Sequence, residues 1–326
     1  MAPFLPDCSR MTQPTRAATA PFEPGYRKLL RSGELRRRVE LAWARLADCD
    51  LCPRDCHIDR HRTIAGAVCR TGELAVVASC HPHFGEERCL VGRHGSGTIF
   101  FSWCNLRCQY CQNYDISQEG HGRAVEPREL AAMMLHLQAQ RCQNINLVTP
   151  SHVVPQILAA VLLAAEKGLS IPLVYNTGGY DALSALALLD GVIDIYMPDM
   201  KYSDEGLARR YSKVRNYPAI NRAAVKEMHR QVGDLAIDDN GVAVRGLLVR
   251  HLVLPDGIAD TADTLRFLAE EVAPETYLNV MDQYRPCYKA HAMPPLDRAI
   301  TAAEYDEALR LADAAGLYCR EDRGAR

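Results

Sequence analysis

The chain has 326 residues, 13 of them cysteine, and a net charge of -2 at pH 7, with 48% hydrophobic and 24% charged residues. This balance is typical of a globular protein and gives no general attraction to nucleic acid or anionic membranes. No apolar run is long enough to cross a bilayer, and the first residues lack the features of a secretory signal. We therefore expect a cytoplasmic protein, in which clustered cysteines bind metal more often than they form disulfides.

The N-terminal part of the chain divides into a tail and a helical stretch. Five prolines within the first 24 residues predict a disordered tail over residues 1–26. Apolar side chains at helical intervals over residues 27–47 predict one or two amphipathic helices. Between Arg27 and Arg70, eleven Lys and Arg residues outnumber six Asp and Glu residues. This excess indicates a solvated helix face or, alternatively, a surface for a partner protein or nucleic acid.

Four cysteines follow with the spacing C-x2-C-x3-C-x12-C; this four-cysteine group is Cys49, Cys52, Cys56 and Cys69. Four thiols can close a four-coordinate site, and the spacing suits zinc or iron. Two interpretations stay open: a zinc ion that only folds the segment, or an auxiliary iron–sulfur cluster that passes electrons or binds substrate. Residues 27–96 are thus predicted to be a helical, cysteine-rich, metal-binding segment. Downstream, His83, Glu86 and Glu87 are expected to form a solvated turn or, alternatively, to line the mouth of the barrel.

A second group of cysteines directly follows the apolar, β-prone run over residues 97–101. Cys104, Cys108 and Cys111 have the spacing C-x3-C-x2-C on the loop that leaves this predicted strand. Iron–sulfur clusters are normally held by four thiolates, and a fourth local cysteine is missing. Three protein ligands would leave one iron open to a small molecule, as a catalytic zinc site keeps an open position. The spacing therefore predicts a reactive metal centre.

From residue 97 onward, predicted strands alternate with predicted helices. The strands are expected near residues 97–101, 145–148, 173–175, 192–197, 247–254 and 276–281. Helices are expected near residues 127–140, 153–167, 181–189, 203–211, 218–231, 260–272 and 301–314. A hairpin-type turn is expected at residues 238–241. Six strands with crossover helices predict an α/β fold over residues 97–326, a partial (β/α)6 barrel of the TIM type that is two units short of closure.

Polar residues gather where the predicted strands end. Thr149 and Ser151 follow the second strand, Asn176 the third, and Asp199 the fourth. Active sites of parallel α/β barrels form at the C-terminal ends of the strands. We therefore expect these side chains to meet the three cysteines and to bind a cofactor. Ser151 has an alternative role as a cap of the following helix.

The motif Cys104-x3-Cys108-x2-Cys111 resembles the cluster motif of the radical S-adenosylmethionine (SAM) superfamily, and within it the group close to the pyruvate formate-lyase activating enzymes. The likeness covers residues 97 to about 290. It implies a [4Fe–4S] cluster held by the three thiolates, with SAM on the fourth iron. It also implies SAM-site roles for Tyr110 near the adenine, Asn113 in a C-x-N extension, Asp199 and Lys201 in a D-x-K motif, and His251 at the ribose.

Ordinary structural roles remain the alternatives for several of these residues. Tyr110 and His251 could be core residues, and Asp199 with Lys201 could be a structural ion pair. One departure from the activating enzymes concerns the turn after the second strand. Those enzymes usually carry Gly-Gly-Glu there to hold the SAM amino group, whereas this chain has Val-Thr-Pro-Ser-His. The chain therefore resembles an activase-like subgroup whose substrate does not transfer by analogy.

The resemblance implies a radical SAM oxidoreductase that cleaves SAM reductively to a 5′-deoxyadenosyl radical, which abstracts hydrogen from a substrate. An electron donor such as flavodoxin or ferredoxin is the implied partner. The substrate is either a glycine of a glycyl-radical enzyme or a small molecule or different peptide residue. The hypothesis from another class is a non-catalytic zinc-binding module that docks to RNA or protein through the basic N-terminal stretch.

Overall fold

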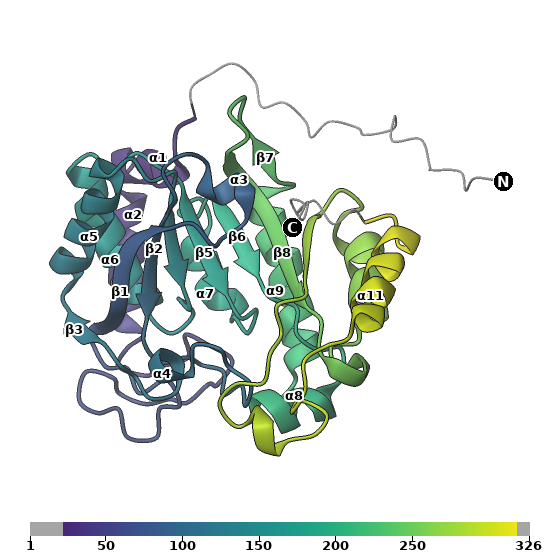
Figure 1. The fold of residues 1–326 in the computed structure, drawn as a ribbon. Coiled ribbons are helices and arrows are strands. Elements are labelled where there is room, and N and C mark those ends of the chain that lie inside the picture. Colours follow the sequence, from purple (N-terminus) through teal and green to yellow (C-terminus); the bar gives the residue numbers. More distant parts are fainter. Residues whose placement is uncertain (1–21, 318–326) are drawn as a thin grey trace.

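The computed structural model describes residues 22–317, so most of the tail predicted over residues 1–26 lies outside the described residues (Figure 1). The helix α1 (Gly25–Arg31) begins within the last part of that predicted tail. Tyr26 is fully buried, and its hydroxyl donates a hydrogen bond of 2.9 Å to the carbonyl of Ile171. Residues 25 and 26 are therefore part of the folded protein, which corrects the end of the predicted tail.

A mostly parallel, open sheet forms the centre of the fold. Its six parallel strands, all expected from the sequence, are β2 (Ser96–Phe101), β4 (Ile145–Val148), β5 (Leu173–Thr177), β6 (Ile195–Pro198), β8 (Ala243–Leu252) and β9 (Tyr277–Met281). They pair in the order β2-β4-β5-β6-β8-β9. Within residues 22–317 the two outer strands of this series, β2 and β9, do not pair with each other, so the sheet is open. The prediction of an α/β fold is confirmed.

Three antiparallel strands extend this sheet: β1 (Ala75–His83), β3 (Arg123–Val125) and β7 (Ala236–Ile237). β1 pairs with β2 on one side and with β3 on the other. The sheet therefore continues into residues 27–96, the segment expected to be helical and cysteine-rich. β7 pairs with β8 across the turn expected at residues 238–241.

The helices agree with the expected positions within a few residues. Two helices, α1 and α2 (Glu34–Ala44), occupy the predicted amphipathic stretch. The others are α3 (Arg88–Val91), α4 (Tyr114–Ser117), α5 (Pro127–Ala139), α6 (Val154–Glu166), α7 (Leu183–Leu189), α8 (Glu205–Ser212), α9 (Tyr217–Val232), α10 (Thr261–Phe267) and α11 (Ala302–Ala314). A π-helical turn, Leu268–Val272, continues α10, and 3-10 turns form at Pro255–Gly257 and Ala290–Ala292.

Local sequence explains where the main covering helices begin and which faces they bury. α5 starts with Pro127 and a capping box in which Glu126 and Glu129 satisfy each other's backbone donors. α6 is apolar around nearly its whole surface, as expected of a helix that is covered on several sides. It contacts α1, α2 and α5, and these helices lie together beside β1 and β2 (Figure 1). This layer buries one face of the sheet.

The loops after the parallel strands emerge at one end of the sheet, because parallel strands all point the same way. α4, which follows β2, and α8, which follows β6, lie at this end, as does the purple-blue loop that follows α2 (Figure 1). The two groups of cysteines lie on these loops. None of the helices formed by residues 22–317 has the length and hydropathy that a membrane span requires.

Candidate active site

The three cysteines of the C-x3-C-x2-C motif lie on the cysteine loop, residues 102–113, which joins β2 to α4. Hydroxyl and backbone groups contact each thiol. Cys108 Sγ lies 3.0 Å from the Ser212 hydroxyl, and Cys111 Sγ lies 3.1 Å from the Ser117 hydroxyl. The backbone N–H of Leu106 donates to Cys104 Sγ at 3.3 Å. The fold therefore holds the loop from both α8 and α4.

A cavity of about 340 Å³, here called the thiol cavity, adjoins this loop. Residues at the ends of all six parallel strands line it: Phe100, Val148, Asn176, Asp199, Arg250 and Met281. Of the residues predicted to bind metal or cofactor, the thiol cavity brings together Cys104, Cys108, Tyr110, Cys111, Asn113, Thr149, Asn176, Asp199 and Lys201. The expectation that scattered strand ends meet the cysteines at one site agrees with this geometry.

Two predicted cofactor residues do not line the thiol cavity. Ser151 is buried, and its hydroxyl lies 3.0 Å from that of Thr177. His251 is fully buried; its Nδ1–H donates to the carbonyl of Met200 at 2.9 Å, so Nε2 accepts from the hydroxyl of Thr261 at 2.9 Å. Burial lowers the pKa of His251 to about 4, so the ring is neutral at pH 7. The polar groups of both side chains thus have hydrogen-bond partners inside the fold.

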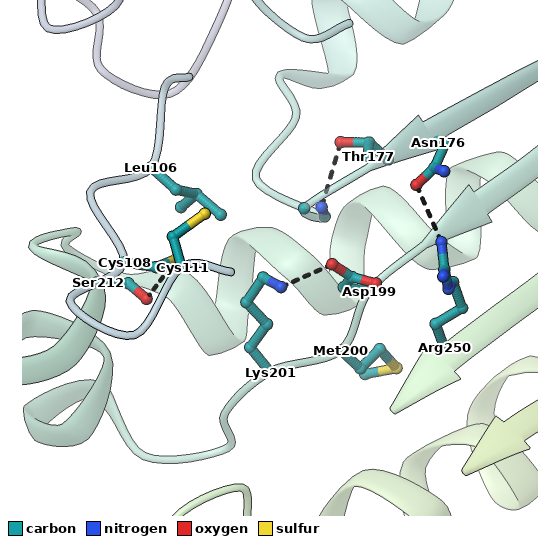
Figure 2. A network of polar contacts seen from close by, with 12 residues as sticks. Leu106, Cys108, Cys111, Asn176, Thr177, Asp199, Met200, Lys201, Ser212 and Arg250 are labelled. Atoms are coloured by element: carbon teal, nitrogen blue, oxygen red, sulfur yellow. Dashed lines mark hydrogen bonds and ion pairs between the residues drawn. The ribbon is translucent and has the colours of Figure 1, made fainter. Parts of the chain in front are cut away.

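Asp199 and Lys201 form an ion pair on the cavity wall, with Lys201 Nζ donating to Asp199 Oδ2 at 2.6 Å. Figure 2 shows this pair facing each other between the cysteine loop and the ends of β5 and β8. Burial would lower the pKa of Lys201, but the nearby acidic groups, Asp199 first among them, together outweigh it and the pKa is raised. The lysine is therefore a permanent cation beside the thiols.

Glu86 and Arg250 form part of the same wall, and Glu87 pairs with Arg250; the sequence favoured a solvated turn here over a place at the mouth of the barrel. The favoured prediction is wrong, because the Glu86 and Glu87 side chains are only 6% and 1% exposed, and the alternative agrees with the lining of the cavity by His83 and Glu86. Arg250 Nε lies 3.1 Å from a carboxylate oxygen of Glu87, and Arg250 Nη1 lies 3.6 Å from one of Glu86. Burial raises the pKa of Glu86, and Arg250 opposes this shift. The sequence around the two glutamates does not predict their ion pairs with Arg250, which lies more than 160 residues away.

The surroundings of the thiols fit an iron–sulfur group. Burial raises the pKa of Cys104 and Cys108, and raises that of Cys111 to about 11, so without a metal these thiols keep their protons at pH 7. Within residues 22–317, no three His, Cys, Asp or Glu side chains are spaced as ligands of a metal ion. In a [4Fe–4S] cluster each thiolate binds a different iron, so its ligands lie farther apart than those of a single ion. Three thiols on one cavity wall suit this larger group.

Tyr110 lies between two of the cysteines and is both a wall residue and a core residue. The Tyr110 hydroxyl accepts a hydrogen bond of 2.7 Å from the Tyr202 hydroxyl, and the two rings pack edge-to-face. A second edge-to-face contact joins it to Tyr284. Burial raises the pKa of Tyr110 well above its usual value, so it stays a neutral hydrogen-bonding group. The two roles weighed from the sequence are therefore compatible.

The four-cysteine group lies in the loop that follows α2. Burial is the main cause that raises the pKa of Cys52, to about 12, and the three other thiols of the group add to the shift. Arg60 is only 2% exposed and donates to the carbonyls of Thr71 and Gly72 at 2.7 and 3.1 Å. Its third contact is Cys49 Sγ, at 3.7 Å from Nη1. Arg60 thus joins a thiol of the four-cysteine group to two backbone carbonyls.

Outside these two groups, Cys80 and Cys287 are half-buried and Cys89 is buried, and none of the three forms a disulfide within residues 22–317. Burial raises the pKa of Cys80 to about 11. None of the three lines the thiol cavity in the part of the chain that the structure describes.

The chain is similar to a known family, to a curated protein and to solved structures. Residues 98–268 match the family model of the radical SAM superfamily. Uncharacterized protein MJ0674 of Methanocaldococcus jannaschii is 33% identical over 283 residues, which are 85% of this chain and 77% of that protein. A solved structure of TYW1 with a lysine-pyruvate adduct bound aligns with a TM-score of 0.41 and 12% identity, over 66% of this chain and 73% of that chain. Streptococcus suis SuiB bound to precursor peptide SuiA aligns with a TM-score of 0.42 and 11% identity, over 65% and 45%.

Proposed function

Because this chain belongs to the radical SAM superfamily, we propose that Cys104, Cys108 and Cys111 hold a [4Fe–4S] cluster and that the thiol cavity holds SAM. Membership of the superfamily implies SAM-cleaving radical chemistry. The observation that carries the proposal is that three thiols of one loop and the ends of all six parallel strands line one cavity. The hypothesis of a non-catalytic zinc module is not favoured, because the family match covers the cysteine loop and most of the sheet.

When bound, the cluster supplies the electron that splits SAM into methionine and a 5′-deoxyadenosyl radical, which takes hydrogen from a substrate. The chain's own residues bind and orient. Asp199 and Lys201 present charges of both signs, which complement the amino and carboxylate groups of SAM. Tyr110 and Asn113 line the cavity beside the thiols, and Thr149 and Asn176 line it at the ends of β4 and β5.

Two substrate classes stay within the proposal. Residues 104–113 and 250–255 resemble the activating enzymes, which supports a glycine of a glycyl-radical enzyme. The four-cysteine group, which the simplest activating enzymes lack, supports a small molecule or another peptide residue instead, and this second class is slightly favoured. The electron donor in either case is a reductant such as flavodoxin or ferredoxin, as is usual in the superfamily.

The four-cysteine group is proposed to hold a second metal centre, either an auxiliary iron–sulfur cluster or zinc, which would need the thiols to lie closer together than they do in this structure. The support is the buried guanidinium of Arg60 against Cys49, since a buried cation is costly unless an anionic group balances it. A metal bound by four thiolates carries that negative charge. Iron, zinc and sulfide analysis of protein with Cys49, Cys52 and Cys56 changed to serine distinguishes the two: loss of zinc alone identifies a zinc site, and loss of iron and sulfide identifies a cluster.

The SAM-cleaving activity is tested with anaerobically reconstituted protein. SAM and dithionite are added, and 5′-deoxyadenosine is measured by chromatography. We expect the product from the wild-type protein and from Cys287→Ser, a matched control whose thiol lies outside both cysteine groups. In Cys108→Ser the yield is expected to fall at least about 100-fold, because one cluster ligand is lost. A fully loaded wild-type protein that forms no 5′-deoxyadenosine would contradict the proposal.

A further inference from the structure

A second cavity, of about 530 Å³, adjoins the cysteine loop at Arg107. It is lined by residues 64–68 and by four basic side chains, Arg54, Arg70, Arg107 and Lys213; it is called the basic pocket below. Arg107 and Cys108 are neighbours in the chain, yet Arg107 lines the basic pocket and Cys108 lines the thiol cavity. The cysteine loop therefore contributes to two distinct cavities, and the proposed function uses only one of them.

The basic pocket brings like charges together without a balancing acid. Over residues 22–317, no Asp or Glu is among the side chains that line it. Gathering cations in a partly desolvated cavity is unfavourable unless an anion compensates them. The charge pattern thus calls for a negatively charged occupant.

Buried donors in the same pocket lack acceptors. Arg54 is anchored by Nε to the carbonyl of Asn105 and by Nη1 to the carbonyl of Lys213, both at 2.8 Å. Its remaining nitrogen, Nη2, and Nη1 of Arg107 are buried and have no hydrogen-bond partner in the part of the chain that the structure describes. An unsatisfied buried donor costs about 1–3 kcal/mol, and more when it is charged. Oxygen atoms of a ligand would remove this cost.

We propose that the basic pocket binds a small molecule through a phosphate or carboxylate group. Guanidinium groups present planar pairs of donors that match both kinds of oxyanion. The volume lies within the range of small-molecule sites, about 300–1,000 Å³. The ligand would bridge residues 54–70, which include two members of the four-cysteine group, and the cysteine loop. Its binding would therefore hold together the two segments that carry the cysteines.

Calorimetric titration of the anaerobically purified protein tests this proposal with three probes: inorganic phosphate, pyrophosphate and citrate. We expect saturable binding of at least one probe, weakened as sodium chloride is raised because the contacts are ionic. Tighter binding of phosphate or pyrophosphate than of citrate would assign the site to a phosphate group, and the reverse order to carboxylates. Each result supports the pocket as an anion site.

Variants locate the binding. Arg107→Gln and Lys213→Gln should each weaken it at least about tenfold, since each removes a charge-assisted contact. Lys213 is exposed, so its replacement leaves the fold intact. Arg128→Gln, on α5 and outside the pocket, is the matched control and should bind as the wild type does. The proposal is overturned if no probe binds or if both pocket variants bind like the wild type.

Discussion

Arg250 lies between two carboxylates on the wall of the thiol cavity and is itself only 16% exposed. Asn279 donates to Glu87 at 2.9 Å, so β9 also contributes to the cluster. Buried charges of this kind are stable only as a set, because removing one partner leaves another without compensation. The set therefore ties the turn after β1 to the ends of β8 and β9, beside the place where SAM is proposed to bind.

We expect Arg250→Met to destabilise the protein by about 3–5 kcal/mol, because it leaves two buried glutamates without their cation. Chemical denaturation followed by circular dichroism measures this change. The triple variant with Glu86→Gln, Glu87→Gln and Arg250→Met removes the charges as a group and should recover most of the loss. An unchanged denaturation midpoint in Arg250→Met would show that the cluster does not stabilise the fold.

Among single residues, those marked by a local motif were the ones that could be predicted. The cysteines, Asp199 and Lys201 lie at strand ends, where sequence position alone directs a side chain to the C-terminal edge of the sheet. His251 lies within β8, so alternation along the strand decides which side it faces, and its partners Met200 and Thr261 belong to other segments. Such contacts depend on tertiary packing that no local pattern encodes.

At the scale of elements, the turn between β5 and α7 shapes the site. Gly179 has φ +73°, and a Cβ placed there would lie 2.1 Å from Asn221 Nδ2 and 2.3 Å from the carbonyl oxygen of Asp199. Asn221, on α9, donates to the carbonyls of Gly179 and Asp199, at 3.0 Å each. The helix thereby joins the ends of β5 and β6 and fixes the start of the Asp199-Met200-Lys201 segment.

We expect Gly179→Ala to weaken SAM binding and to lower the melting temperature, because the methyl group would displace Asn221 or Asp199. The matched control is Gly168→Ala. Gly168 also has a positive φ, of +95°, but a Cβ at this position would meet no atom of the described residues within 4 Å. The control should cost only about 1–2 kcal/mol from backbone strain and leave SAM affinity unchanged. Equal effects of the two variants on SAM affinity, measured by calorimetry, would argue against this role of the turn.

Helices and strands with a regular spacing of apolar residues could be predicted from the sequence, and elements without such a spacing could not. The parallel strands are short apolar runs between amphipathic helices, so their order followed from the chain. β1 contains Cys80, His81 and Pro82, and only its pairing with β2 and β3 makes this stretch a strand. The pairing of β1 with β2 is a tertiary contact that the local sequence does not predict.

Across the whole molecule, two buried neutral histidines link stability to pH. His152 Nε2–H donates to the carbonyl of Ser102 at 3.0 Å, at the start of the cysteine loop. Burial lowers the pKa of His152 to about 3 and that of His251 to about 4, from 6.5. Below pH 6.5 the unfolded chain takes up these protons and the folded protein does not. Stability is therefore complete above pH 6.5 and is lost as the pH falls towards about 4.

We expect the free energy of unfolding to fall between about pH 6.5 and 5.5 by up to about 1.4 kcal/mol for each of the two histidines. In His251→Asn the fall should be about half as large, whereas His291→Asn, at an exposed position, should behave like the wild type. Denaturant titrations at the two pH values measure the difference, and comparing variants cancels any loss of metal in acid. An equal fall in the free energy of unfolding between the two pH values in all three proteins would contradict the role given to His251.

The central claim is that the cysteine loop holds a cluster whose open iron faces SAM in the thiol cavity. Electron paramagnetic resonance of the dithionite-reduced protein, recorded with and without SAM, tests it most directly. We predict an iron–sulfur signal that changes when SAM is added, and that the SAM-sensitive signal is absent from Cys108→Ser but present in Cys287→Ser. A reduced-cluster signal that SAM leaves unaltered in the wild type, or a SAM-sensitive signal that survives in Cys108→Ser, would contradict the claim.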